Sequence, residues 1–164
     1  MAQKRLSLLG SDLALTRFVG TASSVPLEAA DSWGSLDLSV VPGQRNGLPQ
    51  PREARDLATT TERANLAQAL VVRLLTPRGA LSHLGHAQFG CRLVELIGRL
   101  NNETTRNLAR LHTLEALGEE PRVQETLGLV VRTHPDRPDV VRIDFSVLPR
   151  GDAEPLSLSL EVVL

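Results

Sequence analysis

The sequence predicts an α+β fold, with about three helices packed on a small antiparallel sheet and an extended N-terminal arm. Between residues 59 and 118, leucines recur every three or four residues, which is the spacing of amphipathic helices. After residue 122, apolar and polar residues alternate in three consecutive runs that are separated by short turns. This alternation is typical of neighbouring antiparallel strands with one face on a core.

The first third of the chain is predicted to be an arm and linker (residues 1–55), followed by a single domain (residues 56–164). The segment 41–55 contains three prolines and two glycines and little that could be buried, which is typical of a linker. Residues 35–41 alternate like a short strand, whereas residues 1–30 show no periodic signal.

The first helix is predicted over residues 59–76. Thr59 and Glu62 match a capping box, in which each side chain satisfies a free N–H at the helix start. Pro77 disfavours helical geometry in the residue before it and ends the helix. The apolar stripe consists of Leu66, Leu70 and Leu74.

A second, short helix is predicted over residues 91–100 and a third over residues 102–118, where Gly118 is placed as a left-handed C-terminal stop. The leucines expected along one side of the third helix are Leu108, Leu111, Leu114 and Leu117.

Three strands are predicted, over residues 123–131, 139–148 and 155–164. The residues expected to face the helices are Val123, Leu127, Leu129, Val131, Val141, Ile143, Phe145, Val147, Leu156, Leu158, Leu160, Val162 and Leu164.

The composition disfavours several classes of ligand. A net charge of −1 and an aromatic content of 2% are unfavourable for binding nucleic acid, anionic membranes or carbohydrate. No apolar run approaches the roughly 20 residues of a membrane span. Polar residues interrupt the apolar part of the N-terminus, so no signal peptide is predicted. The single cysteine, Cys91, excludes an internal disulfide and indicates intracellular synthesis and assembly.

Catalytic and metal-binding patterns are weak. Cys91 opens an amphipathic segment, where a free cysteine is more often a small buried hydrophobe than a nucleophile. His83, His86 and Cys91 are close in sequence, but no fourth zinc ligand accompanies them. No phosphate-binding or dinucleotide-binding motif is present. The sequence therefore predicts no metal, no cofactor and no catalytic residues.

The segment Glu119-Glu120-Pro121-Arg122 joins the helical pattern to the strand pattern and has three interpretations. Two acids could form a glycosidase pair, but adjacent residues point apart and cleft-lining aromatics are scarce. A solvent-exposed corner is the plainer interpretation. In the third, Pro121 holds Glu120 extended, and the corner displays Glu120 and Arg122 for charge-assisted bonds to a partner. A display of this kind predicts that replacing either residue leaves thermal unfolding nearly unchanged.

The sequence from Asp56 to Leu164 resembles the phage baseplate protein W family, the sheath-initiator components of contractile tails and related injection machines. The resemblance rests on "RANLAQALVVRLLTPRGAL" (63–81), "HLGHAQFGCRLVELIG" (83–98) and a Glu-Pro-Arg signature at Glu120, Pro121 and Arg122. Matching turn residues are Leu75, Thr76, Pro77, Gly79, Phe89 and Gly90. Residues 1–50 lie outside it.

The resemblance implies a structural role in a baseplate assembled in the cytoplasm. Glu120, Pro121 and Arg122 would dock on baseplate wedge proteins. Sheath subunits would pair with the last strand, at Leu156, Ser157, Leu158, Ser159 and Leu160. The central tube or hub is a further partner, and the family's symmetry implies a ring of six copies.

Two alternatives remain open. Some members of the family carry a lysozyme-like label, which implies a peptidoglycan-cleaving enzyme. The same fold occurs in a bacterial anti-adaptor, which implies a regulatory binding module. The absence of a catalytic pattern favours the non-enzymatic, structural role.

Overall fold

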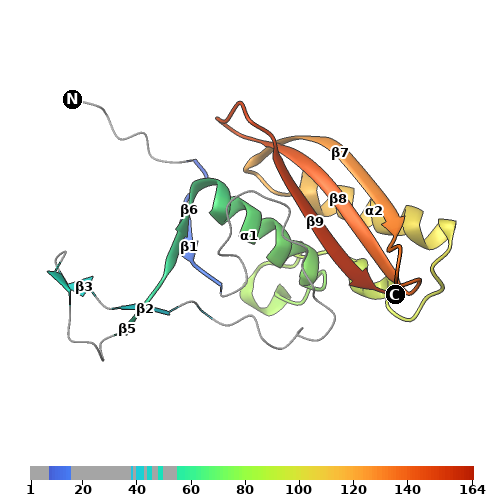
Figure 1. Cartoon of the computed structure of the whole chain (residues 1–164), viewed down its shortest axis with the longest axis horizontal. Helices are drawn as coiled ribbons and strands as arrows, with labels where there is room; N and C mark the ends of the chain where they lie inside the picture. The colour runs from blue at the N-terminus through green and yellow to red at the C-terminus, as the bar shows by residue number, and fades with distance from the viewer. Residues whose placement is uncertain (1–7, 16–37, 39, 43, 46–47, 50–54) are drawn as a thin grey trace.

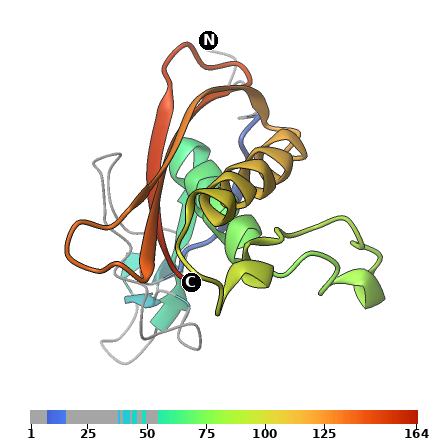
Figure 2. The ribbon, with the colours of Figure 1, turned by 90° about the vertical axis from the view of Figure 1, so that its right-hand side faces the viewer.

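The computed structural model describes residues 8–15, 38, 40–42, 44–45, 48–49 and 55–164. Within them, two α-helices lie on one face of a three-stranded antiparallel sheet (Figures 1 and 2), so the α+β class is confirmed. The helices are α1 (Glu62–Leu75) and α2 (Glu103–Gly118), and the strands are β7 (Val123–Thr133), β8 (Val140–Pro149) and β9 (Leu156–Val163). The core fills the space between the helices and the inner face of the sheet.

Helix α1 keeps the predicted apolar stripe but starts later than expected. Leu66, Leu70 and Leu74 are all buried. The predicted capping box is wrong, because strand β6 (Thr59–Thr61) occupies the residues before the helix and no side chain caps it. The Glu62 N–H instead donates to the carbonyl of Gly10. Threonines are β-branched and favour strands, so pairing with another segment outweighs the local cap.

The second predicted helix is reduced to the single 3₁₀ turn η2 (Leu93–Leu96), and another such turn, η1 (Ser82–Leu84), precedes it. Ile97 after η2 is extended, and Gly98 follows with φ +83°. These two conformations stop the turn from growing into an α-helix.

Helix α2 is confirmed, but its buried face differs from the predicted leucine stripe. Leu111 and Leu114 are 49% and 38% exposed, whereas Leu117 is buried. The buried residues are Thr105, Ala109, His112, Thr113, Ala116 and Leu117. Gly118 is the last helical residue rather than a left-handed stop, since Glu119 continues with φ −83° and donates back to the helix.

The sheet has the strand order β7-β8-β9, with both connections antiparallel. The predicted inward residues of β8 are buried, as are Leu156, Leu160 and Val162 of β9. Leu127 was predicted to face the core but is about half exposed. The register of β7 shifts between Thr126 and Gly128, so Leu127 is an extra residue that interrupts the alternation.

The N-terminal third contributes small two-stranded sheets. Strand β1 (Ser11–Leu13) pairs with β6, β2 (Val40–Pro42) pairs with β5 (Arg55–Leu57), and β3 (Gln44–Arg45) pairs with β4 (Leu48–Pro49). The predicted strand over 35–41 lies mostly outside the described residues. Residues 8–15, which gave no sequence signal, bury Leu9 and Ala14.

Candidate docking corner and sheet edge

The corner between α2 and β7 is built around a buried carboxylate. Glu120 is 4% exposed, so the expectation that the corner displays it is wrong. One carboxylate oxygen lies 2.6 Å from the Arg122 Nε, and the other lies 3.2 Å from an Nη of Arg73 near the end of α1. The 3₁₀-type bond from the Glu120 N–H to the Leu117 carbonyl turns the residue inward. Glu120 therefore ties both helices to the start of β7.

Two opposing effects set the ionisation of this carboxylate. Burial raises the pKa of Glu120, but the hydrogen bond and charge of Arg122 and the charge of Arg73 outweigh burial, and its pKa is lowered. Glu120 is thus held as a carboxylate between two guanidinium groups.

The exposed side of the corner carries a second ion pair. Arg78 makes two hydrogen bonds to Glu119, of 2.6 and 3.1 Å, and a third to the amide oxygen of Gln88. The hydrogen bond to Glu119 raises the pKa of Arg78. An open hollow of about 570 Å³ adjoins this pair, lined by Arg73, Gly85, His86, Ala87, Gln88, Phe89 and Glu119.

Arg122 and Pro121 are the members of the predicted docking signature that reach the surface. Pro121 is exposed, and the Arg122 side chain is 27% exposed. Arg122 is not free, because its Nη1 also lies 3.3 Å from the Leu9 carbonyl oxygen. The corner thus presents a proline and a guanidinium whose direction Glu120 fixes.

Sequence reasoning missed Arg73 and Phe89 as parts of this corner. Arg73 is buried under the Phe89 ring, with its guanidinium carbon 4.6 Å from the ring centroid. A signal was available: Arg73 stands beside Leu74 on the apolar face of α1, where a charge requires a buried partner.

The second candidate site is the open edge of β9. Among the described residues, β9 pairs only with β8, so its other edge has no neighbouring strand. The Leu164 N–H donates to the backbone carbonyl of Asp139, so this pair is hydrogen-bonded. It fixes which pairs of the β8–β9 ladder are hydrogen-bonded and which are not. It follows that Ser157, Ser159 and Glu161 belong to non-hydrogen-bonded pairs, and their backbone N–H and C=O groups point to the open edge.

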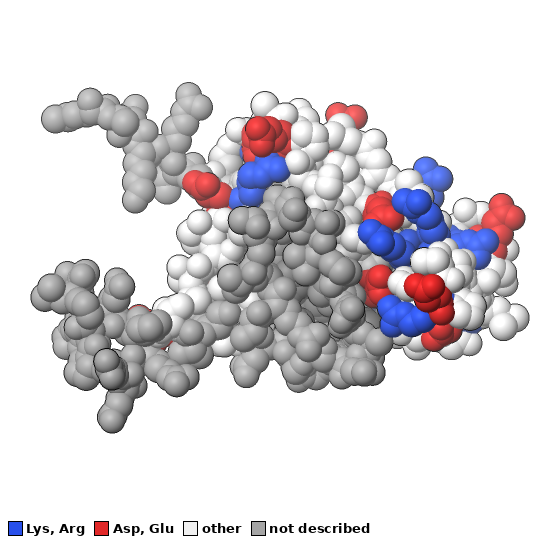
Figure 3. All heavy atoms as spheres, viewed as in Figure 1, with Lys and Arg blue, Asp and Glu red and all other residues white. Residues whose placement is uncertain are grey.

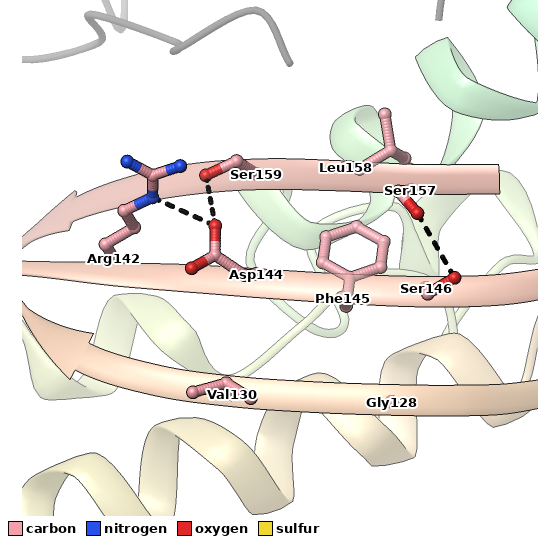
Figure 4. Close-up of a pocket in the computed structure, with 9 residues that line it drawn as sticks. All are labelled: Gly128, Val130, Arg142, Asp144, Phe145, Ser146, Ser157, Leu158 and Ser159. Atoms are coloured by element: carbon pink, nitrogen blue, oxygen red, sulfur yellow. Dashed lines mark hydrogen bonds and ion pairs between the residues drawn. The ribbon is translucent and has the colours of Figure 1, made fainter. Parts of the chain in front are cut away.

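The outer face of the sheet is polar beside this edge. Asp144 accepts bonds from Ser159 (2.8 Å) and Arg142 (2.9 Å), and Ser146 and Ser157 face each other across the strands (Figure 4). Burial raises the pKa of Asp144, but its hydrogen bonds from Ser159 and Arg142 and the charges of Arg142 and Arg132 outweigh burial, so its pKa is lowered. A hollow of about 350 Å³ lies on this face, and its lining includes Gly128, Asp144 and Ser159. Charged groups of both signs gather near the end of the sheet where the C-terminus of the chain lies (Figure 3).

The residues considered for catalysis or metal binding form no metal-binding cluster in the part of the chain that the structure describes. Cys91 is buried, its Sγ lies 3.3 Å from the His112 carbonyl oxygen, and burial raises the pKa of the thiol. His83 and His86 are exposed on the preceding loop. The described part of the chain holds no group of three or more His, Cys, Asp and Glu side chains placed to bind a metal ion. None of its helices is long and apolar enough to cross a membrane.

Comparisons with known proteins support the fold. No family model and no curated protein matches the chain. A crystal structure of a protein from Geobacter sulfurreducens, provisionally described as a tail lysozyme, is similar with a TM-score of 0.55 and 24% sequence identity. The match covers 64% of this chain and 93% of that one. The likeness shows a shared fold, and membership of the baseplate protein W family stays a prediction.

Proposed function

We propose that this protein is a structural baseplate component of a phage tail or contractile injection system, which docks on wedge proteins and initiates the sheath. The observation that carries the proposal is the open edge of β9 on a fold shared with a protein described as belonging to a tail. Unpaired backbone groups on an edge strand are a template for a further strand from another protein.

The edge has the chemistry that strand addition needs. Leu156 and Leu160 anchor β9 in the core, and the Leu158 side chain is partly buried. The backbone groups of Ser157 and Ser159 point outward, and both side chains are small enough not to obstruct an incoming strand. An arm of a sheath subunit that pairs here would extend the sheet to a fourth strand.

The corner provides the second attachment. In this proposal Pro121 and Arg122 contact the wedge proteins, and Glu120 acts from within by fixing the Arg122 guanidinium. A planar guanidinium held in one direction suits a geometrically specific bond to a carboxylate or a carbonyl. Copies arranged in a ring, six by the family's symmetry, would then present their β9 edges together, around the central tube or hub.

The test is assembly of sheath on baseplates that contain a proline at the edge. Ser159→Pro removes one outward N–H and leaves the bonds between β8 and β9 in place. Ser159→Ala is the matched control, because it removes the hydroxyl bond to Asp144 and keeps the N–H. We expect Ser159→Ala to support sheath of normal length and Ser159→Pro to enter baseplates without nucleating sheath. Normal sheath on Ser159→Pro baseplates excludes β9 as the template.

A peptidoglycan-cleaving enzyme is the second candidate, because the similar structure is described as a tail lysozyme. A glycosidase acid needs a raised pKa and a free proton to donate. Glu119 is bound by Arg78, and the pKa of Glu120 is lowered by its arginines, which is the opposite of that requirement. Purified protein is therefore expected not to clear peptidoglycan between acid and neutral pH. Clearing that disappears in Glu119→Gln or Glu120→Gln protein establishes the enzyme instead.

A further inference from the structure

Residues 8–15 lie between β6 and α1 and also contact Arg122 of the corner, all of which are distant from them in the sequence. The surface formed by these contacting residues of β6, α1 and the corner is called the groove. Strand β1 runs beside β6 and the start of α1 (Figure 1), in the register Ser11↔Thr61 to Leu13↔Thr59. The Ala14 N–H donates to the carbonyl of Ala58, and the Glu62 N–H donates to the carbonyl of Gly10. The segment is therefore held by a strand ladder on one side.

Two buried amides of α1 hold the other side. The Gln68 side chain donates to the Leu13 carbonyl (2.8 Å) and accepts from the Leu15 N–H (2.9 Å), so one primary amide replaces a neighbouring strand. Asn65 donates to the Leu9 carbonyl at 2.8 Å. Asn65 and Gln68 are only 3% and 5% exposed. Buried amides on an apolar helix face are costly unless they are hydrogen-bonded, and here the extended backbone is their partner.

The groove demands little from the side chains of its occupant. Only Leu9 and Ala14 are buried, whereas Leu8, Ser11 and Asp12 are exposed. Gly10 has φ +70°, a conformation that favours glycine. The groove thus binds an extended backbone whose side chains follow the pattern Leu-Gly-x-x-x-Ala. In this chain the pattern is formed by Leu9, Gly10 and Ala14.

We propose that the groove is a binding site for an extended peptide segment and that it accepts residues 8–15 of a second copy of the chain. An exchanged segment makes the same contacts as the chain's own, so exchange requires no new interface. Residues 16–37 separate the segment from Leu38, and a chain of this length could reach at most several tens of ångströms, at roughly 3.3 Å per extended residue. That reach would allow the segment to enter the groove of a copy that lies alongside.

That copies of the chain lie close together in a ring is part of the proposed function. The contacts that form the groove are independent of it. Tethered neighbours compete with the chain's own segment because their effective concentration is on the order of millimolar. The corner also takes part, since Arg122 donates to the same Leu9 carbonyl that Asn65 holds. A partner that draws Arg122 away removes one bond to the segment and favours its exchange.

The test is disulfide trapping between two full-length single variants, Ser11→Cys and Thr61→Cys, mixed at about 1 mM, the range of such effective concentrations. Both positions are exposed and face each other in a non-hydrogen-bonded pair. Cα atoms in such a pair are about 4.5 Å apart, within the range of a disulfide. We expect a covalent heterodimer joined between these two cysteines, identified by mass spectrometry of the linked peptide.

The matched control is a mixture of Ser146→Cys and Ser157→Cys proteins, which are register partners in adjacent strands of the main sheet. Strands β8 and β9 form a hairpin in the core and are not expected to exchange. We expect at least ten-fold more heterodimer from the first mixture than from the control. The Ser11→Cys/Thr61→Cys double variant should close within one chain when dilute.

Equal cross-linking of the two mixtures overturns the proposal, as does failure of the double variant to close. The first result shows that a second copy does not enter the groove, which leaves it to the chain's own segment or to an arm of another protein. The assay contains no sheath or wedge protein, so its outcome is independent of whether the protein belongs to a baseplate.

Discussion

Replacing Glu120 by alanine tests the central contact of the corner. The substitution removes the carboxylate that lies between Arg73 and Arg122 and leaves the Arg73 side chain, which is 9% exposed, without its nearest partner. The remaining carboxylate near Arg73 is Glu119, at 3.9 Å, and the Arg73 Nε already has no hydrogen-bond partner. Glu120→Ala therefore leaves a buried charge poorly compensated.

The expected cost is that of breaking a buried ion pair, about 3–5 kcal/mol of the free energy of unfolding. For a chain of this size, 1 kcal/mol shifts Tm by about 2–4 °C, so we expect a fall of roughly 6–20 °C. This expectation reverses the sequence-based one, in which the corner was exposed and its loss left thermal unfolding unchanged. The measurements are urea denaturation and thermal unfolding followed by circular dichroism.

Glu119→Ala is the matched control, because the same residue type sits one position earlier in an exposed pair. The Glu119 side chain is 35% exposed and its pair with Arg78 is accessible to water, so its loss is expected to destabilise the protein much less than the loss of Glu120. Adding Arg73→Met to Glu120→Ala removes the stranded charge and should recover part of the loss. If Glu120→Ala is no more destabilising than Glu119→Ala, the buried ion pair does not stabilise the fold.

Three further predictions concern acid stability, a turn and a helix cap. The pKa of Glu120 is lower in the folded protein than its unfolded value of about 4.3, so its ionised carboxylate contributes fully to the free energy of unfolding above that value. This contribution is lost as pH falls through the folded pKa. The difference in free energy of unfolding between the wild-type protein and Glu120→Gln, measured by urea denaturation, should therefore become smaller below about pH 4. Gly90→Ala should prevent folding or cost several kcal/mol, since φ is +106° and a Cβ would lie 2.6 Å from a backbone oxygen, whereas Gly128→Ala, with open space around it, should fold; soluble yield and Tm check both. Asn102→Ala should cost about 1 kcal/mol in urea denaturation, because its side chain accepts the Thr105 N–H at the start of α2, and an unchanged midpoint contradicts a role for this cap.

The helices and the sheet follow largely from local pattern. The stripe of Leu66, Leu70 and Leu74 and the alternation in β8 and β9 each place a whole apolar face on the core, and burial then decides the element. The pattern was less informative where backbone conformation intervened. Bulges in β7 turned Leu127 outward, and the extended Ile97 with left-handed Gly98 stopped a helix that the sequence allowed.

The candidate sites were located by sequence, but their chemistry was decided by tertiary contacts. The Glu-Pro-Arg segment was identified from its residues, yet its exposure depends on Arg73, which lies 47 positions earlier. The groove for residues 8–15 had no sequence signal, because it holds backbone groups through Asn65 and Gln68. Every residue except proline carries the same backbone N–H and C=O groups, so no side-chain pattern records such an interaction. Periodicity along the chain thus determined α1, α2 and the three strands of the main sheet, and only the folded structure determined which buried charge or amide meets which partner.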